Sequence, residues 1–347
     1  MMKKTIAVLF GGRSSEYGVS LHSAAAVIRC LSPERYETIL LGITQKGAWF
    51  RFYGTPDEIE ADTWAQGVCV PAVISPDTSH HGILEFTPQG NRVTSLDAAF
   101  PILHGQNGED GTVQGLLKLA GIPCIGCGLL SSALCMDKNL AHKLAAQAGV
   151  QVPKSVVIDQ IGDPALLEQA AKGLRYPLFV KPVGAGSSFG ITRITEKEQL
   201  AEAVAYALMH DTKVIIEEAV EGFEVGCAVL GTENLLVGEV DEIELSSGFF
   251  DYTEKYTLKT SKIHMPARIE RQTKERIQET AKLLYRTLRC SGFARVDCFL
   301  TPDGEIVFNE INTIPGFTSH SRYPNMMKGI GLDFSDIVEQ IVETGVA

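Results

Sequence analysis

Two oxygen-bearing side chains stand two residues apart near the C-terminus, in the stretch FNEINTIPGFTSHSRYP (308–324). Glu310 and Asn312 follow an apolar run that is typical of a β-strand, and alternate residues of a strand point to the same face of its sheet. Carboxylate and amide oxygens are ligands that suit Mg²⁺. For this pair alone, a polar strand end at the surface is the better explanation, so the rest of the chain has to decide between the two interpretations.

The segment VDCFLTPDGEIVFNEIN (296–312) predicts a β-hairpin, because two apolar runs flank a Pro-Asp-Gly turn. Folding the chain about that turn places Arg295 and Asp297 near Glu310 and Asn312. A structural cluster of salt bridges would explain this grouping without a metal. The gathering of Asp, Glu and Asn side chains nevertheless favours a Mg²⁺ site.

Magnesium in enzymes usually accompanies phosphate, and one glycine-rich segment of the chain could bind phosphate. In KPVGAGSSFG (181–190), Lys181 closes a predicted strand. The backbone N–H groups behind it could approach phosphate oxygens closely. The spacing matches neither the Walker A motif nor the G-x-G-x-x-G fingerprint, and a plain hairpin fits the segment equally well.

Two further loops could contribute to such a site. FGGRSSEYGVS (10–20) lies between a predicted strand and a helix, whose N-terminus would attract anions, but the carboxylate of Glu16 in it would suit a substrate ammonium. SSGFFDYTEKYTLKTS (246–261) mixes Gly, aromatic residues and Lys without regular periodicity, which is typical of a lid. An ordinary surface loop is the alternative, and Lys255 and Tyr256 are its best candidates to face phosphate.

Alternating strands and helices must position these residues. Apolar runs predict strands at 4–12, 38–44 and 96–105 and helices at 19–31 and 112–121. This order predicts an α/β domain with a parallel sheet that extends to about residue 125. Residues 51–95 are polar and turn-rich, and no element is assigned to them.

A helix at 131–153, with a Ser cap, a Gly stop and a Pro just beyond, leads into a second unit. The later predicted strands are 176–194 (strand, glycine loop, strand), 213–220, 224–231 and 235–245, followed by the hairpin, and the later helices are 198–210, 270–289 and 332–343. The sequence therefore predicts two or three domains, in agreement with its length of 347 residues.

Composition excludes several classes of protein. With 45% hydrophobic and 21% charged residues the chain is typical of a soluble globular protein, and a net charge of −11 without a basic block gives no support for nucleic-acid binding. No apolar run approaches the ~20 residues of a membrane helix, and MMKKTIAVLFGG (1–12) predicts a first strand rather than a signal peptide.

The eight cysteines do not form a recognisable metal or disulfide pattern. Cys124 and Cys127 form one C-x-x-C motif, but a zinc site would need two more ligands, and neither a second such motif nor a His-x₃₋₅-His pair follows. A redox pair is less favoured than two small buried residues around a Gly turn. We expect a cytoplasmic protein with reduced thiols.

Seven motifs in order give the sequence a resemblance to a known family: FGGRSSEYGVS, LHGQNGEDGTVQG, CMDK, VKPVGAGSSFGI, FFDYTEKY, ARVD and NEINTIPGFTSHS. Over nearly its whole length the chain resembles the D-alanine–D-alanine ligases, ATP-grasp enzymes of peptidoglycan precursor synthesis. The similarity looks closest to the branch that joins D-alanine to D-serine in vancomycin-resistant bacteria. The resemblance implies a three-domain α/β ATP-grasp fold, with an N-terminal domain (1–125), a central subdomain (126–220) and a C-terminal subdomain (221–347), and with ATP between the last two.

The resemblance also implies a role for each matching residue. The nucleotide would be bound by Lys138, Lys181 and Lys255 at its phosphates, Glu224 at the ribose, and Glu217 and Glu218 beside the adenine. Two Mg²⁺ ions, with Mn²⁺ as the alternative, would be held by Asp297, Glu310 and Asn312. The first D-alanine would bind Glu16, in a triad with Ser187 and Tyr256, and Arg295 and the N–H of Gly316 would stabilise the oxyanion. The other substrate-binding residues would be Ser321, which binds the carboxylate of the second substrate, with His104, Phe250 and Arg322.

The reaction implied is phosphorylation of the D-alanine carboxylate by ATP, followed by attack of the second substrate on the acyl phosphate. D-serine is the expected second substrate, because Arg322 stands where alanine-selective relatives usually carry an apolar residue and Phe250 where they often have tyrosine. D-lactate is less favoured, since lactate-making relatives carry a histidine in a different lid. One departure is Gly18 in Gly-Val-Ser, where the family usually has Glu.

Several alternatives remain open at this point. They are an ordinary D-alanine–D-alanine ligase, another ATP-grasp carboxylate–amine ligase, a non-catalytic nucleotide-binding regulator and a Rossmann oxidoreductase. The loop around Glu16 favours the D-alanine family over other ATP-grasp ligases. The expected partners are small-molecule D-alanine and D-serine and a second copy of the chain in a homodimer, without nucleic acid or membrane.

Overall fold

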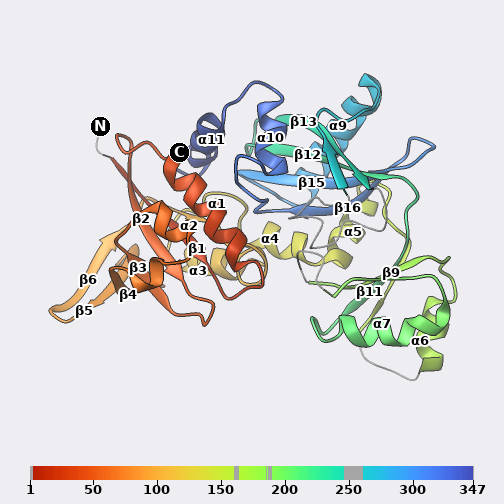
Figure 1. The fold of residues 1–347 in the computed structure, drawn as a ribbon, viewed down its shortest axis with the longest axis horizontal. Helices are drawn as coiled ribbons and strands as arrows, with labels where there is room; N and C mark the ends of the chain where they lie inside the picture. The colour runs from red at the N-terminus through yellow and green to blue at the C-terminus, as the bar shows by residue number, and fades with distance from the viewer. Residues whose placement is uncertain (1–2, 160–163, 185, 187–189, 246–260, 347) are drawn as a thin grey trace.

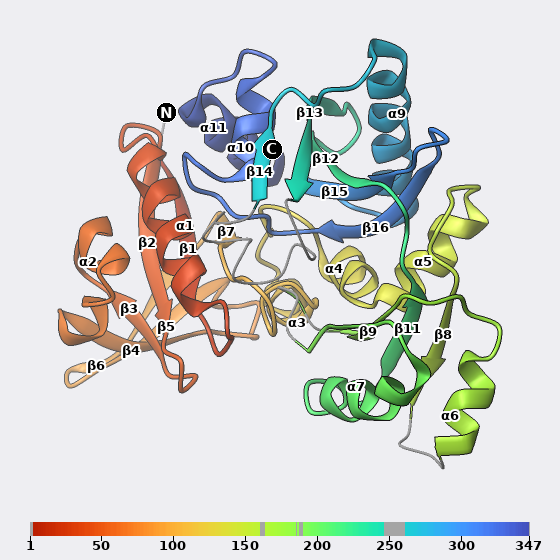
Figure 2. The same cartoon turned by 45° about the vertical axis from the view of Figure 1, so that its right-hand side comes forward.

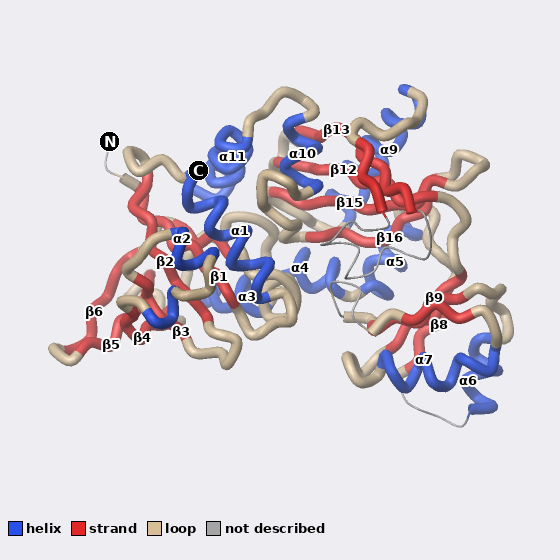
Figure 3. The backbone as a smooth tube through the Cα atoms, viewed as in Figure 1, coloured by secondary structure: helices blue, strands red, loops and turns tan. Residues whose placement is uncertain are grey.

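The computed structural model contains three β-sheets that follow one another along the chain (Figure 1). It describes residues 3–159, 164–184, 186, 190–245 and 261–346. Figure 3 shows the strands gathered into these separate sheets, with helices on their outer faces and between them. No helix in these ranges is both long and apolar enough to span a bilayer.

The first sheet has the strand order β6-β5-β4-β3-β2-β1-β7. Its strands are β1 (Lys4–Gly11), β2 (Tyr36–Ile43), β3 (Trp49–Phe52), β4 (Cys69–Ile74), β5 (Gly82–Thr87), β6 (Gly90–Ser95) and β7 (Ala98–Pro101). Its helical segments are α1 (Tyr17–Cys30), α2 (Pro56–Glu60), η1 (Trp64–Gln66) and α3 (Thr112–Leu119). The predicted strands and helices of this domain are confirmed.

This sheet is mixed rather than wholly parallel. β1 pairs in parallel with β2 and β7, whereas β3 to β6 add antiparallel strands beyond β2. Apart from the first two residues of β3, these antiparallel strands come from the segment 51–95, to which the sequence pattern assigned no element. They are short and partly exposed, and β6 has no buried residue, so they lack the continuous apolar runs that identify buried parallel strands.

The helix predicted at 131–153 is two helices, α4 (Leu129–Met136) and α5 (Lys138–Gln147). Asp137 lies between them in an extended conformation, and its side chain accepts a hydrogen bond of 2.9 Å from the N–H of Leu140. This is an N-cap, which begins a new helix. The apolar periodicity continues across the break and therefore does not reveal it. The signal that reveals it is Asp137 in the motif CMDK, because Asp is a favoured N-cap residue.

The second sheet has the order β10-β9-β11-β8 and is antiparallel at each pairing. It consists of β8 (Ser155–Ile158), β9 (Leu178–Pro182), β10 (Thr192–Ile194) and β11 (Val214–Glu218), with α6 (Pro164–Ala171), η2 (Lys197–Gln199) and α7 (Leu200–Ala207). The apolar side chains of one face pack against α6 and α7. The opposite face carries Lys181 and Glu217.

The third sheet has the order β14-β13-β12-β15-β16. It consists of β12 (Phe223–Leu230), β13 (Leu236–Leu245), β14 (Ser261–His264), β15 (Phe293–Leu300) and β16 (Ile306–Asn312), with α9 (Arg271–Thr287), α10 (Arg322–Lys328) and α11 (Phe334–Val346). The predicted hairpin is confirmed as β15–β16. Sequence patterns assigned no helix to α10, which is only seven residues long.

Two sets of helices connect the predicted domains. Buried residues of α11 share one core with β1 and α1, so the C-terminal helix packs on the first domain. Residues of α4 and α5 share a core with β12, β15 and α9, so these helices pack on the third sheet although they precede the second. Figure 2 shows the second and third sheets one below the other, with α5 beside both.

Candidate active site

The β15–β16 hairpin brings the predicted metal ligands together. Asp297 lies directly opposite Glu310, and Arg295 lies opposite Asn312. Asp297 is almost fully buried and accepts 2.8 Å hydrogen bonds from Arg295 Nε and from Asn312 Nδ2. The sequence placed these four residues near one another, and the register confirms it.

The chemistry of this donor set fits a divalent cation. Two carboxylates that face each other across a strand pair repel, and a cation between them would remove the repulsion. The Asn312 carboxamide could turn its oxygen toward the same position, since its two ends are distinguished only by their hydrogen bonds. The described residues contain no cluster of three or more His, Cys, Asp or Glu side chains arranged for a metal, so the third protein ligand would have to be Asn312.

Glu16 lies where three segments of the chain converge. It is 6% exposed and occupies the N-cap position of α1. A Cβ on Gly105 would overlap its carboxylate, and a Cβ on Gly186 would lie 3.3 Å from Oε2. Glycine at both positions therefore allows the first-domain loop and the glycine-rich loop to approach Glu16.

One cavity of about 40 Å³ joins these groups. Its lining residues include Glu16, Lys138, Gly186, Glu310 and Asn312. The structure therefore brings predicted ammonium-binding, phosphate-binding and metal-binding residues to one place from three different sheets or loops. Lys138 begins α5 and its backbone N–H donates to Val183 O at 3.2 Å, which holds the helix start beside the end of β9.

Lys181 and Glu217 lie on neighbouring strands with Nζ 2.6 Å from Oε2. Burial alone would raise the pKa of Glu217, but Lys181, together with His142 and Lys138, holds that pKa below its usual value. His142, which the sequence did not indicate, donates from Nε2 to Asn309 O at 2.8 Å and has Nδ1 3.4 Å from Glu217 Oε1. Burial lowers the pKa of His142, so its ring is neutral at pH 7.

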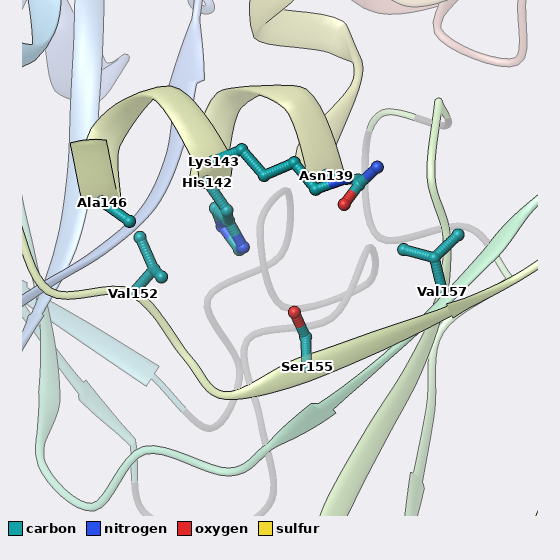
Figure 4. Close-up of a pocket in the computed structure, with 7 residues that line it drawn as sticks. All are labelled: Asn139, His142, Lys143, Ala146, Val152, Ser155 and Val157. Atoms are coloured by element: carbon teal, nitrogen blue, oxygen red, sulfur yellow. The ribbon is translucent and has the colours of Figure 1, made fainter. Parts of the chain in front are cut away.

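A cavity of about 330 Å³ lies beside this cluster, between α5 and β8. Figure 4 shows His142 and Lys143 of α5 on one side and Ser155 and Val157 of β8 on the other. Ser155 pairs directly with Glu217, so the cavity and the Glu217 side chain lie on the same face of the second sheet. The neighbouring Glu218 instead pairs with the exposed Arg175, at 3.2 Å.

Arg322 occupies a buried ionic cluster. Its Nε and Nη2 each donate to Asp241 at 2.7 Å, its Nη1 donates to Glu224 Oε1 at 2.7 Å, and Nη2 lies 3.5 Å from Asp297 Oδ1. The predicted ribose-binding and specificity residues are thus neighbours, and both are linked to the hairpin that carries the predicted metal ligands. The sequence predicted only a strand around Asp241 and gave no indication that Asp241 belongs to the site.

The corner after β16 carries the other predicted substrate contacts. Ser321 Oγ accepts a hydrogen bond from the Thr318 N–H at 3.0 Å, and a Cβ on Gly316 would lie 3.2 Å from it. Gly316 and Ser321 therefore lie side by side. Ser187, Phe250, Lys255 and Tyr256 lie outside the residues that the structure describes, and so does the predicted lid from 246 to 260.

His104 and Glu109 lie in the loop LHGQNGEDG (103–111). Burial lowers the pKa of His104 to about 4, and both its ring nitrogens bond to protein atoms, Nδ1 to Ile314 O and Nε2 to Ser23 Oγ. Burial raises the pKa of Glu109 to about 8, and the charge of Glu16 adds to the rise. Glu109 lines the same cavity as Glu16, and the sequence did not predict it as a site residue, although it lies in the family motif LHGQNGEDGTVQG.

The eight cysteines are all free thiols. Cys127 is buried and Cys124 partly buried, and Gly126 between them has φ of 112°. Burial raises the pKa of Cys124 to about 12. The interpretation of this motif as two small residues around a glycine turn is confirmed.

Comparisons with known proteins show the family to which the chain belongs. The family model described as D-ala D-ala ligase N-terminus matches residues 5–127, and the model described as D-ala D-ala ligase C-terminus matches residues 144–343. The crystal structure of VanG D-Ala:D-Ser ligase from Enterococcus faecalis superposes with a TM-score of 0.92, at 56% identity over 99% of each chain.

Two curated relatives extend the comparison. A putative D-alanine–D-lactate ligase from Streptomyces coelicolor is 46% identical over 98% of this chain and 97% of its own length. A D-alanine–D-alanine ligase from Caldicellulosiruptor bescii is 39% identical over 100% of this chain and 96% of its own. The three sheets correspond to the ATP-grasp architecture of these ligases. The chain therefore belongs to the D-alanine–D-alanine ligase family of ATP-dependent, peptide-bond-forming enzymes.

Proposed function

We propose that this chain joins D-alanine to D-serine through a D-alanyl phosphate, for peptidoglycan precursors that confer vancomycin resistance. The observation that carries the proposal is the position of Arg322, which immediately follows Ser321 and lies in contact with the site. The high similarity to a D-Ala:D-Ser ligase structure supports the same second substrate. The enzyme would act in the cytoplasm as a homodimer on these two small molecules.

ATP would bind between the second and third sheets. Lys138, Lys181 and, from the lid, Lys255 would contact the phosphates, while Glu217 and Glu218 would border the adenine. The cavity beside His142 is large enough for part of a nucleotide. Glu224, which Arg322 holds in place, would bind the ribose.

Asp297, Glu310 and Asn312 would hold two Mg²⁺, and Mn²⁺ is the substitute we expect. When bound, these ions neutralise charge on the transferring phosphoryl group. Glu16 would bind the ammonium of the first D-alanine and direct its carboxylate toward the phosphate, with Ser187 and Tyr256 completing the triad. In the second step, Arg295 and the Gly316 N–H would stabilise the oxyanion, and Ser321 would bind the carboxylate of the second substrate.

Arg322 supports D-serine through its unused donors. Three of its five N–H groups donate to Asp241 and Glu224. A remaining N–H could bond to the serine hydroxyl, directly or through water. D-alanine would leave that donor without a partner, which costs about 1–3 kcal/mol.

Competition between second substrates tests this assignment. With D-alanine fixed as the first substrate, kcat/KM for D-serine is expected to exceed that for D-alanine by about 10- to 100-fold. Mass spectrometry of the products from mixed D-alanine, D-serine and D-lactate would identify the preferred product. Equal kcat/KM for D-alanine and D-serine would instead favour an ordinary D-alanine–D-alanine ligase. A dominant D-lactate product would favour the activity named for the Streptomyces relative.

The metal assignment has its own test. Replacing Glu310 with Gln removes one anionic ligand, so the Mg²⁺ concentration for half-maximal rate is expected to rise by about 10-fold or more, and excess Mg²⁺ should restore part of the turnover. Glu305→Gln, on the exposed turn of the same hairpin, is the matched control and should behave like the wild type. An unchanged Mg²⁺ dependence in a folded Glu310→Gln variant would remove Glu310 from the metal ligands.

A further inference from the structure

The corner Thr313–Phe317 belongs to the C-terminal part of the chain, yet first-domain residues hold its backbone. Thr313, Ile314 and Phe317 are buried, and the ring of Pro315 restricts the backbone between them. Gly316 lies between Pro315 and Phe317 in this corner and has no side chain of its own to anchor it. The orientation of its N–H therefore depends on what holds its neighbours.

Both polar backbone groups of Ile314 bond to one loop of the first domain. The N–H of Ile314 donates to Glu109 Oε1 at 3.0 Å, and its carbonyl oxygen lies 2.8 Å from His104 Nδ1. Since a carbonyl only accepts, His104 must carry its proton on Nδ1. These contacts fix the peptide groups on both sides of Ile314.

Ser23 of α1 holds the other end of the corner. Its Oγ accepts a hydrogen bond from the Phe317 N–H at 3.2 Å and lies 3.1 Å from His104 Nε2. With the His104 proton on Nδ1, Nε2 is the acceptor and the Ser23 hydroxyl donates to it. Ser23 is fully buried and His104 is 4% exposed, so water does not compete for these bonds.

Glu109 closes the network with its second oxygen. Its Oε2 accepts a hydrogen bond of 2.8 Å from the N–H of Gly105, in the loop that carries His104. The hydrogen bonds thus run without interruption from Phe317 through Ser23 and His104 to Ile314 and Glu109. Each backbone N–H and ring or hydroxyl donor named here has an acceptor, and a buried network of this kind holds a single geometry.

We propose that Ser23, His104 and Glu109 are positioning residues that clamp the Thr313–Phe317 corner to the first domain and so aim the Gly316 N–H at the oxyanion. The inference rests on the proposed function, in which Gly316 stabilises the tetrahedral oxyanion. It assigns His104 to the corner rather than to direct contact with substrate, since both its ring nitrogens are occupied. It also makes the second chemical step depend on the docking of the first domain.

His104 offers a matched pair of variants. Asn places an amide N–H near the position of Nδ1 and can still donate to Ile314 O, whereas Leu cannot. His104→Leu is expected to lower kcat by about 10- to 100-fold, because the corner loses its donor and the oxyanion loses an aligned N–H. His104→Asn is expected to recover most of that loss.

Two further measurements separate positioning from a general structural defect. Positional isotope exchange in ¹⁸O-labelled ATP with D-alanine alone reports reversible formation of D-alanyl phosphate, and it should stay within about 3-fold of the wild type. The affinity for a phosphinate dipeptide analogue, whose tetrahedral oxygens resemble the oxyanion, should fall by the same factor as kcat. Ser23→Ala, which removes two bonds from the network, and Glu109→Gln, which removes one, should show the same pattern with smaller losses.

Three results would overturn the inference. They are normal kcat in folded His104→Leu, an equal fall of isotope exchange and kcat, and failure of His104→Asn to recover activity. If His104→Leu does not fold, Ser23→Ala and Glu109→Gln decide by the same split. Failure of the proposed function is distinguishable, because it is read from the product of the wild-type enzyme: a ligase with another second substrate would still show isotope exchange, and an enzyme that forms no D-alanyl phosphate would show none.

Discussion

Replacing Arg295 with alanine is expected to lower kcat by about 10²- to 10³-fold with a much smaller change in KM for ATP. The Arg295 side chain is only 11% exposed, and its Nε and Nη2 bond to Asp297 at 2.8 and 2.7 Å. The guanidinium is therefore already oriented before substrate binds. A donor held in this way stabilises developing charge without reorganisation, and its loss falls on the second chemical step. Steady-state kinetics with ATP, D-alanine and D-serine would measure both constants.

Loss of folding is the competing outcome for this variant, because Asp297 would lose its strongest partner. Circular dichroism and the unfolding midpoint would show whether the variant is folded. Arg295→Lys keeps the positive charge but not the two-point contact, so it should lose less activity than the alanine variant. A folded Arg295→Ala enzyme with normal kcat would exclude Arg295 from oxyanion stabilisation.

Replacing Arg322 with leucine is expected to lower the free energy of unfolding by about 3–5 kcal/mol. Asp241 is 1% exposed and would be left as a buried carboxylate without its bidentate partner, and Glu224 would lose its 2.7 Å contact. Urea denaturation followed by tryptophan fluorescence would measure the change. The test of substrate preference on this variant must therefore be made at a temperature where the variant is folded.

An exposed arginine in a helix supplies the control. Arg271 pairs with Glu275 one turn away, and its side chain is 88% exposed, so Arg271→Leu should change stability by less than about 0.5 kcal/mol. Adding Asp241→Asn to Arg322→Leu removes the orphaned charge and should recover part of the loss. An Arg322→Leu protein as stable as the wild type would show that the buried cluster makes no net contribution to the free energy of unfolding. If it also kept the preference for D-serine, the role of Arg322 in specificity would fail as well.

Much of the site could be predicted because its parts are local in the chain. The turn at 301–304 is flanked by complementary apolar runs, so the closeness of Asp297 and Glu310 follows from a short-range pattern. Their direct pairing depends on a register shift between Asp297 and Cys298, which the pattern does not predict. Lys181 lies near the end of a buried strand and Glu16 lies in the loop after one. Polar residues at the ends of neighbouring strands meet at the same edge of a sheet. The motifs also carried a family resemblance, which supplied roles that geometry in the sequence could not.

The same local signals failed where elements are short or interrupted. The antiparallel strands between residues 51 and 95 have few buried positions, and the break at Asp137 is invisible to a continuous apolar period. The sequence did not indicate that α11 completes the core of the first domain. The amphipathic pattern of a helix predicts that one face is buried, but it does not predict which part of the protein packs against that face.

The sequence by itself determined the candidate ligands: which residues carry oxygen, which carry positive charge, and which of them share a strand face. Only the tertiary structure decided which other residues hold these candidates in place. Glu109 and His104 bond to Ile314 across 205 and 210 residues, and Arg322 bonds to Asp241 across 81. Periodicity and turn chemistry act over a few residues, whereas such contacts arise when whole sheets and helices bury their apolar faces against one another, and that packing brings distant polar groups within bonding distance.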